Sequence, residues 1–223
     1  MGDAIGEILP LALGITISPI PIIAAILMLL SPRAKRTSVG FLLGWVLGII
    51  LAVGVFTLIS QLLPEDDPAA SAPIAGSVKI LLGLLLLLLA GKQWGGRPTE
   101  GESPQLPGWM KAIDTMTAAK ATGLGFLLSA LNPKNLIMGA GAGVAVGGAG
   151  LGSGQVTLVI AMFTVVAAAS VAVPVIAYLV AATRMGGPLD VLRQWLTKEN
   201  SVVMATLLVV MGVVMIGKGI GNF

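Results

Sequence analysis

Two short proline motifs hold the residues of this sequence that are best suited to binding chemistry. They read Ser18-Pro19-Ile20-Pro21 and Asn132-Pro133-Lys134-Asn135. A proline removes a backbone donor and clashes with the carbonyl one turn earlier, so each motif predicts a broken helix with freed backbone polar groups. Ser18 and Asn132 precede the prolines and are typical N-cap residues, which begin a helix whose amides point at a ligand. The motifs therefore predict two half-helix ends suited to an anion.

Lys134 is the strongest single candidate for ligand binding. It falls near the centre of an apolar stretch and is the only charge placed that deep. An unpaired Lys at the centre of a bilayer costs at least ~2.5–3.5 kcal/mol, so such residues usually line a cavity or bind a partner. Two interpretations are open: a cationic contact for a carboxylate, phosphate or sulfate group, or a structural clamp on the carbonyl oxygens that the breaks free.

The composition places these motifs in a membrane. Of the 223 residues, 56% are hydrophobic and 10% are charged, and the mean hydropathy is +0.99. Soluble domains have roughly 25% charged residues, and a soluble core of this length could not bury so much apolar surface. The surplus must face lipid, which excludes a soluble enzyme, a disordered chain and a nucleic-acid-binding domain. No nucleic-acid partner is expected.

The residue types also argue against catalysis. The sequence has no His and no Cys, so the commonest general base, the commonest metal ligand and every thiolate site are missing. A pairing of Ser129 with Lys134 would join residues five apart across a proline, which do not share a helical face. We therefore predict no enzymatic activity, no metal and no cofactor.

Six apolar stretches approach the roughly 20 residues that a membrane helix needs. They cover residues 4–30, 38–63, 75–91, 121–148, 155–182 and 200–219. The first is preceded by Asp3 and contains Glu7, with no basic residue before it, which predicts a mature transmembrane helix rather than a cleaved signal peptide. The sequence thus predicts an all-α, multi-pass protein of the plasma membrane, the inner membrane of the cell.

The basic residues are concentrated in three connecting segments, 31–37, 92–120 and 183–199. Ten of the 13 Lys and Arg residues lie there: Arg33, Lys35, Arg36, Lys92, Arg97, Lys111, Lys120, Arg184, Arg193 and Lys198. The loops at 64–74 and 149–154 have none, and the first of them holds Glu65, Asp66 and Asp67. The positive-inside rule then places the basic segments in the cytoplasm and both termini on the extracytoplasmic side.

The long segment 92–120 divides the six predicted spans into two sets of three. Because each set has an odd number of spans, the second set enters the membrane from the opposite side, as in the inverted repeats of many secondary transporters. Each proline motif interrupts the first helix of its half, and paired breaks of this kind point to a midplane binding site. We expect a first repeat at 1–91, a cytoplasmic linker at 92–120 and a second repeat at 121–223.

Glycines recur every four residues in the second and fourth predicted spans. They are Gly40, Gly44 and Gly48 in the second span and Gly139, Gly143 and Gly147 in the fourth. Small residues at this spacing let two helix backbones approach closely. The stripes predict tight helix packing or the gliding of one helix along another.

The proline motifs resemble those of a known family of exporters. Short Ser/Thr-Pro-x-Pro and Asn-Pro-Lys motifs in the first and fourth spans are typical of the LysE superfamily. The segment ISPIPIIAAILMLLSPRAKRTSVGFLLGWVLG resembles more narrowly the GAP or Sap branch, actinobacterial membrane proteins linked to addressing glycopeptidolipids or sulfolipids to the cell surface. The resemblance implies export from the cytoplasmic side by an oligomer such as a homodimer. Its motif positions correspond here to Ser18, Pro19, Pro21, Asn132, Pro133 and Lys134.

One departure from the amino-acid exporters of that superfamily bears on the substrate. The first motif of those exporters resembles Pro-Gly-Pro, whereas the middle residue here is Ile20. The bulk of Ile20 argues against a pocket for a small amino acid. We predict a transporter that exports or flips a lipid or lipid-linked anionic molecule of glycolipid type by alternating access. Its substrate-binding residues would be Ser18, Pro19, Pro21, Asn132, Pro133, Lys134 and Asn135. Two other functions stay open: export of a small soluble solute such as an amino acid, and a non-transporting scaffold for lipid export.

Overall fold

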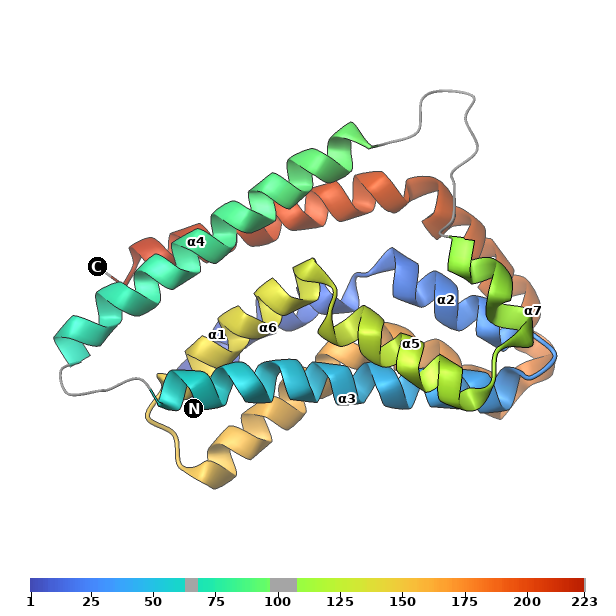
Figure 1. The fold of residues 1–223 in the computed structure, drawn as a ribbon, viewed down its shortest axis with the longest axis horizontal. Coiled ribbons are helices and arrows are strands. Elements are labelled where there is room, and N and C mark those ends of the chain that lie inside the picture. Colours follow the sequence, from blue (N-terminus) through green and yellow to red (C-terminus); the bar gives the residue numbers. More distant parts are fainter. Residues whose placement is uncertain (63–67, 97–107, 223) are drawn as a thin grey trace.

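The computed structural model describes residues 1–62, 68–96 and 108–222, and these ranges form helices joined by short turns (Figure 1). The helices are α1 (Gly2–Thr16), α2 (Pro19–Leu29), α3 (Ala34–Gln61), α4 (Pro68–Gly95), the 3₁₀ helix η1 (Gly108–Thr115), α5 (Ala118–Ala130), α6 (Pro133–Gly147) and α7 (Ser153–Ile220). The acidic residues Glu65, Asp66 and Asp67 and the basic residue Arg97 of the predicted loops lie outside the described residues.

Both predicted helix breaks are confirmed. α1 ends at Thr16 and α2 begins at Pro19, and the two helix axes are bent by 53°. α5 ends at Ala130 and α6 begins at Pro133. In each pair a proline occupies the first position of the second helix, where its fixed φ suits the helix and its missing N–H would have had no intrahelical partner.

The number of membrane spans is confirmed only in part. Among the described residues, four helical segments are long and apolar enough to cross a membrane: α3, Pro73–Gly95 of α4, and Ser153–Ala182 and Arg184–Ile220 of α7. A fifth results if the bent pair α1–α2 counts as one span. α5 and α6, with 13 and 15 residues, are individually too short for a bilayer that needs about 20.

The prediction of a loop at 183–199 is wrong. This segment is helical and belongs to α7, which is interrupted only by the non-helical backbone of Ala181. Asp190 forms an ion pair with Arg193 at 2.6 Å and accepts a hydrogen bond from Gln194 Nε2 at 2.8 Å. Leu189 and Leu196 of the same segment are buried in the hydrophobic core, so apolar packing on one face, together with these pairs, keeps a charged segment helical.

The two glycine stripes form one close interface between α3 and the broken helix α5–α6. A Cβ on Gly44 would overlap the carbonyl oxygen of Thr122 in α5, and a Cβ on Gly143 of α6 would lie 2.5 Å from the Cβ of Phe56 in α3. The predicted packing role of the stripes is therefore confirmed. α4 packs along α7 in a similar way, since a Cβ on Gly83 would lie 2.8 Å from the carbonyl oxygen of Gly212.

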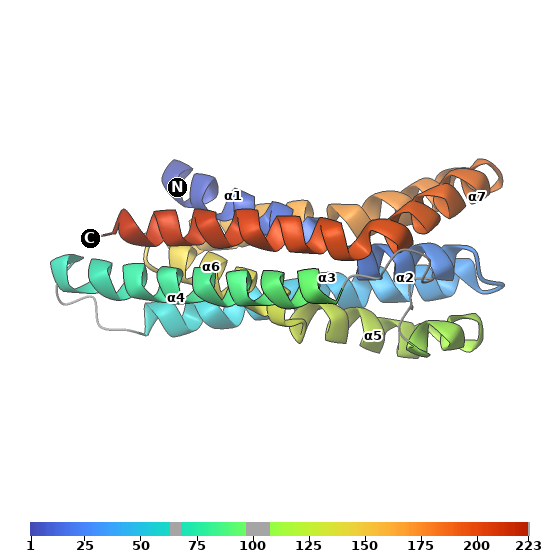
Figure 2. The same cartoon turned by 90° about the horizontal axis from the view of Figure 1, so that it is seen from above.

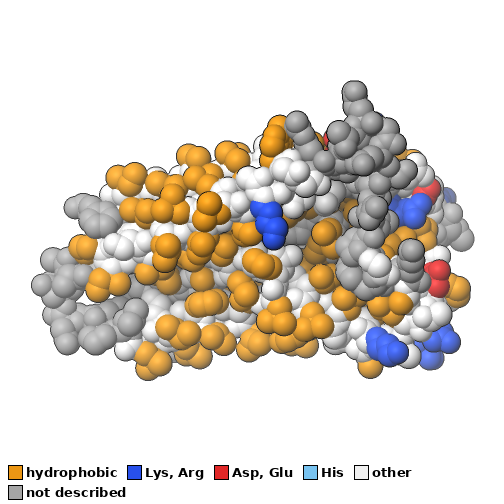
Figure 3. Space-filling view, turned by 45° about the horizontal axis from the view of Figure 1, so that its top comes forward, with side chains coloured by type: hydrophobic (Ala, Val, Ile, Leu, Met, Phe, Trp, Pro, Cys, Tyr) orange, Lys and Arg blue, Asp and Glu red, His pale blue; other side chains and the backbone are white. Residues whose placement is uncertain are grey.

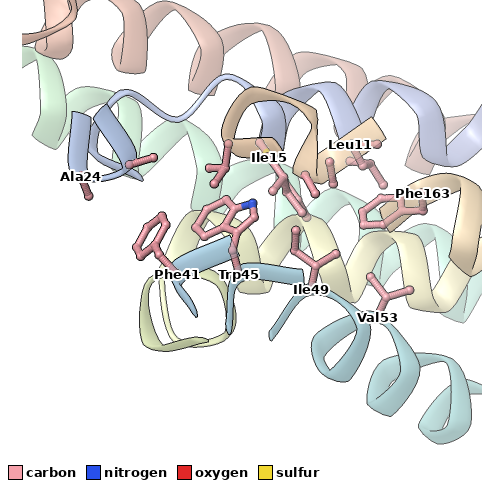
Figure 4. Close-up of a cluster of buried hydrophobic side chains, with 14 of the residues drawn as sticks. Leu11, Ile15, Ala24, Phe41, Trp45, Ile49, Val53 and Phe163 are labelled. Carbon is pink, nitrogen blue, oxygen red and sulfur yellow. The ribbon is translucent and has the colours of Figure 1, made fainter. Parts of the chain in front are cut away.

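The hydrophobic core lies where α1, α2, α3 and α7 meet. Figure 4 shows Ile15 of α1, Trp45 of α3 and Phe163 of α7 pointing into the same cluster. Phe41 and Trp45 are fully buried and stack with their ring centroids 6.4 Å apart. This core fixes α1 and α2 on either side of their break against two long helices.

The surface divides into an apolar body and a charged end. Figure 3 shows hydrophobic side chains over most of one face and charged side chains gathered mainly at its right-hand end. At that end Figure 1 shows the α2–α3 connection and the bend of α7, while Figures 1 and 2 place both chain termini toward the opposite end. Large apolar side chains are exposed on these helices, such as Val165 of α7 (72%) and Leu88 of α4 (71%), which suits contact with lipid.

Candidate functional site at the two helix breaks

The break between α1 and α2 frees backbone carbonyls inside the molecule. In a continuous helix the Gly14 carbonyl would accept from the Ser18 N–H, but here that N–H donates to Thr16 O at 2.9 Å. The Ser18 hydroxyl donates to Ile15 O at 2.8 Å. Ser18 therefore occupies the N-cap position of α2 but turns its side chain back toward α1, and no cap hydrogen bond forms.

Lys134 of α6 reaches across to this break. Its Nζ donates to Gly14 O at 2.6 Å, to Ser18 Oγ at 2.5 Å and to Ile17 O at 3.2 Å. A protonated Lys has three N–H donors, so each donor has a partner in this conformation. Lys134 and Ser18 are 3% and 2% exposed. Ser18 and Lys134 are 116 residues apart in the sequence. Their contact therefore brings the two proline motifs together.

Asn132 and Asn135 organise the second break. Asn132 Oδ1 accepts from the Lys134 backbone N–H at 3.0 Å, which makes Asn132 the N-cap of α6. Asn135 Nδ2 donates to Leu128 O at 3.2 Å, a carbonyl that the end of α5 leaves without its usual partner. Asn135 is 1% exposed, and its Oδ1 has no hydrogen-bond partner among the described residues. Two adjacent side chains of α6 therefore satisfy freed carbonyls at both breaks: Lys134 binds those of Gly14 and Ile17 at the first, and Asn135 binds that of Leu128 at the second.

The prolines have different environments. Pro19 and Pro21 are buried in the first turn of α2, whereas Pro133 is exposed on α6. Because Pro19 and Pro21 lack N–H groups, Ile20 supplies the only backbone donor among the first three residues of α2. The structure thus brings Ser18, Asn132, Lys134 and Asn135 into one hydrogen-bonded region, while Pro19, Pro21 and Pro133 shape the helix ends beside it.

The electrostatics of the site come from backbone dipoles. No carboxylate among the described residues pairs with Lys134. Its ammonium instead lies at the C-terminal end of α1, against the oxygens of Gly14 and Ile17, where the partial negative charge of a helix is concentrated. These contacts match in kind the interpretation of Lys134 as a clamp on freed carbonyl oxygens. The sequence could not show which carbonyls are involved, because a backbone carbonyl carries no side-chain signal.

A second polar cluster lies far from the breaks, where α1, α4 and α7 converge. Lys79 forms an ion pair with Glu7 and donates to Asn222 Oδ1 at 3.3 Å. Lys218 Nζ donates to the Glu7 carbonyl oxygen at 2.9 Å. Both basic side chains therefore contact Glu7. The cluster ties three helices together at the end where both termini lie.

The long apolar helices, the exposed apolar body and the broken pairs define an all-helical, multi-pass membrane protein. The chain belongs to the Sap family, because the family model SfLAP, described as "Sap, sulfolipid-1-addressing protein", matches residues 8–221. This match covers nearly the whole chain and confirms the resemblance to the Sap branch. No curated protein and no solved structure matches the chain.

Proposed function

We propose that this protein exports or flips an anionic lipid, of glycolipid or sulfolipid type, from the cytoplasmic side of the membrane outward. The observation that carries the proposal is the position of Lys134, a buried cation at the junction of two broken helices and without a carboxylate partner among the described residues. A cation held only by neutral oxygens can accept an anionic head group in their place. Membership of a family named for sulfolipid-1 addressing supports a lipid as the substrate.

The proposed architecture is six crossings in an inverted three-plus-three repeat. In support, α3 packs on the broken pair α5–α6, and α7 packs on the broken pair α1–α2. The third helix of the first half, α4, packs along α7, which also supplies the last span of the second half. The sixth crossing would be α5 and α6 together, as α1 and α2 together form the bent pair. Rocking of these two halves about the breaks would alternate access to Lys134.

The proposed binding step is an exchange of partners. In this conformation all three donors of Lys134 are used, and the contact with Ile17 O, at 3.2 Å, is the longest. A sulfate or phosphate oxygen would replace that carbonyl first. The acyl chains would stay in the bilayer between helices, so the head alone would cross the interior of the protein.

Reconstitution into liposomes tests this proposal. Fluorescent phosphatidylglycerol should move between leaflets in the presence of the protein, and fluorescent phosphatidylcholine should move much less. Lys134→Gln keeps N–H donors for the α1 carbonyls but removes the charge, so the variant should fold. Its rate of lipid movement should fall by roughly 10- to 100-fold, the factor that corresponds to the loss of one hydrogen bond to a charged group. Lys134→Arg, which retains the charge, should keep part of the activity.

The same liposomes separate the other functions. Movement of phosphatidylglycerol at the wild-type rate by folded Lys134→Gln would refute the role of Lys134. Efflux of preloaded radiolabelled amino acids without lipid movement would establish a solute exporter instead. Movement of neither, with the purified protein folded, would establish a non-transporting scaffold.

A further inference from the structure

A groove between α4 and α6 lies next to the candidate site. Its volume is about 450 Å³, within the range of clefts that hold small ligands, ~300–1,000 Å³. Seven residues line it: Leu85, Leu88, Leu89 and Lys92 of α4, and Pro133, Leu136 and Ile137 of α6. These residues recur at three- and four-residue intervals, so each helix presents one continuous face to the groove.

The lining is apolar except at one end. Lys92 lies in the last turn of α4 and is exposed, and its side chain has no ion-pair or hydrogen-bond partner among the residues that the structure describes. Trp94, about half exposed at 49%, follows two residues later, and Trp is enriched at the level of lipid head groups. Lys92 therefore lies close to the membrane interface, at the end of α4 that carries the basic linker.

The dimensions suit one acyl chain that enters from that interface. From Lys92 to Leu85 the wall follows seven residues of α4, about 10 Å at 1.5 Å per residue. This reaches most of the way through one leaflet of a hydrocarbon core that is ~30 Å thick. Pro133, the residue before Lys134, also lines the groove, so a lipid in the groove would lie beside the second helix break.

We propose that the α4–α6 groove is the lateral entry site for an anionic lipid of the cytoplasmic leaflet. One acyl chain lies along Leu85, Leu88 and Leu136, and the anionic head group contacts Lys92. The apolar wall alone would accept any lipid, and the charge of Lys92 selects an anionic one. This inference rests on the proposed function for the direction in which the lipid then moves, but binding in the groove does not depend on transport.

Photolabelling of the full-length protein in phosphatidylcholine nanodiscs tests the site. Two probes are compared at trace level, phosphatidylglycerol and phosphatidylcholine with the same diazirine on one acyl chain. The phosphatidylglycerol probe should label peptides 85–92 and 133–137 about five-fold more than the phosphatidylcholine probe, the factor expected for one Lys beside an anionic lipid. Lys92→Gln should abolish this preference without lowering labelling by phosphatidylcholine.

Two bulky substitutions check that the groove itself holds the probe. Leu88→Trp, at a side chain that is 71% exposed and so tolerant of change, should reduce labelling by both probes. Leu43→Trp on α3, 56% exposed on another helix, should leave it unchanged. Equal labelling by both probes in the wild type, or a preference that survives Lys92→Gln, would overturn the proposal.

The outcomes separate this site from the transport proposal. Selective labelling of the groove by a protein that moves no lipid in liposomes supports the groove and refutes transport. Lipid movement without selective labelling refutes the groove and leaves transport standing. The two measurements therefore fail independently.

Discussion

Ser18 has two hydrogen-bonding roles at the first helix break. Its hydroxyl accepts from Lys134 Nζ and donates to Ile15 O, so it links the ammonium to the backbone of α1. A hydroxyl is the smallest side chain that accepts and donates at once. The residue before the first proline is therefore needed as much for the buried cation as for the helix break.

Replacing Ser18 should weaken the folded state. Ser18→Ala removes both hydrogen bonds and leaves the Ile15 carbonyl unpaired at depth, so we expect a loss of about 2–4 kcal/mol in the free energy of unfolding. Ser18→Thr is the matched control, since it retains the hydroxyl and should lose much less. Unfolding in mixed micelles, followed by circular dichroism, measures both. A Ser18→Ala protein as stable as the wild type would contradict this role.

At the scale of elements, glycine decides which helices approach most closely. α3 contacts α5 through Gly40, Gly44 and Gly48, whose added Cβ atoms would overlap atoms of α5. α6 contacts α3 through Gly143 and Gly147 in the same way. In lipid, where no hydrophobic effect drives helices together, such close contact supplies the van der Waals energy of association. The broken helix α5–α6 is thus attached to an unbroken one.

A pair of substitutions within α3 isolates this effect. Gly44→Ala would place its Cβ against Thr122 O and 2.9 Å from the Phe126 backbone nitrogen, and overpacking of this kind costs about 1–3 kcal/mol. Gly54→Ala is the control, because no atom lies within 4 Å of its added Cβ. It should be neutral or stabilise α3 by up to ~1 kcal/mol. Thermal denaturation in detergent should rank Gly44→Ala lowest, and equal values for the two variants would contradict the packing role.

The whole molecule has two chemically different ends. The charged side chains visible in Figure 3 gather mainly at the end of the α2–α3 connection. The cluster of Glu7, Lys79 and Lys218 lies where α1, α4 and α7 converge, toward the termini. The positive-inside rule assigns the first end to the cytoplasm, which would place both termini outside the cell membrane.

Single cysteines test this orientation cleanly, because the native sequence has none. Ser153→Cys, exposed at the start of α7, should react with a membrane-impermeant maleimide added to intact cells lacking an outer barrier. Ala112→Cys, exposed in η1, should react only after the membrane is permeabilised. The reverse labelling pattern would invert the proposed topology and the direction of transport.

Several features could be predicted from the sequence because they depend on local chemistry. The prolines at 19 and 133 determined where α2 and α6 begin, since proline suits the first position of a helix, where its missing N–H would have no intrahelical partner. The glycine spacing determined that α3 and α6 have close-packing faces. The segment 183–199 was predicted wrongly, because glycines, a proline and charges suggested a loop where the Asp190–Arg193 pair and the helical backbone continue α7.

What the sequence determined by itself is that this is a membrane protein with two broken helices and one deep Lys, because composition and proline chemistry act locally. Only the tertiary structure decided what that Lys contacts. Gly14 O lies 120 residues away in the chain from Lys134, and a backbone carbonyl has the same chemistry in every residue, so no pattern of side chains could identify it. The same holds for the α4–α6 groove, whose walls come from separate helices and meet only when the chain is folded.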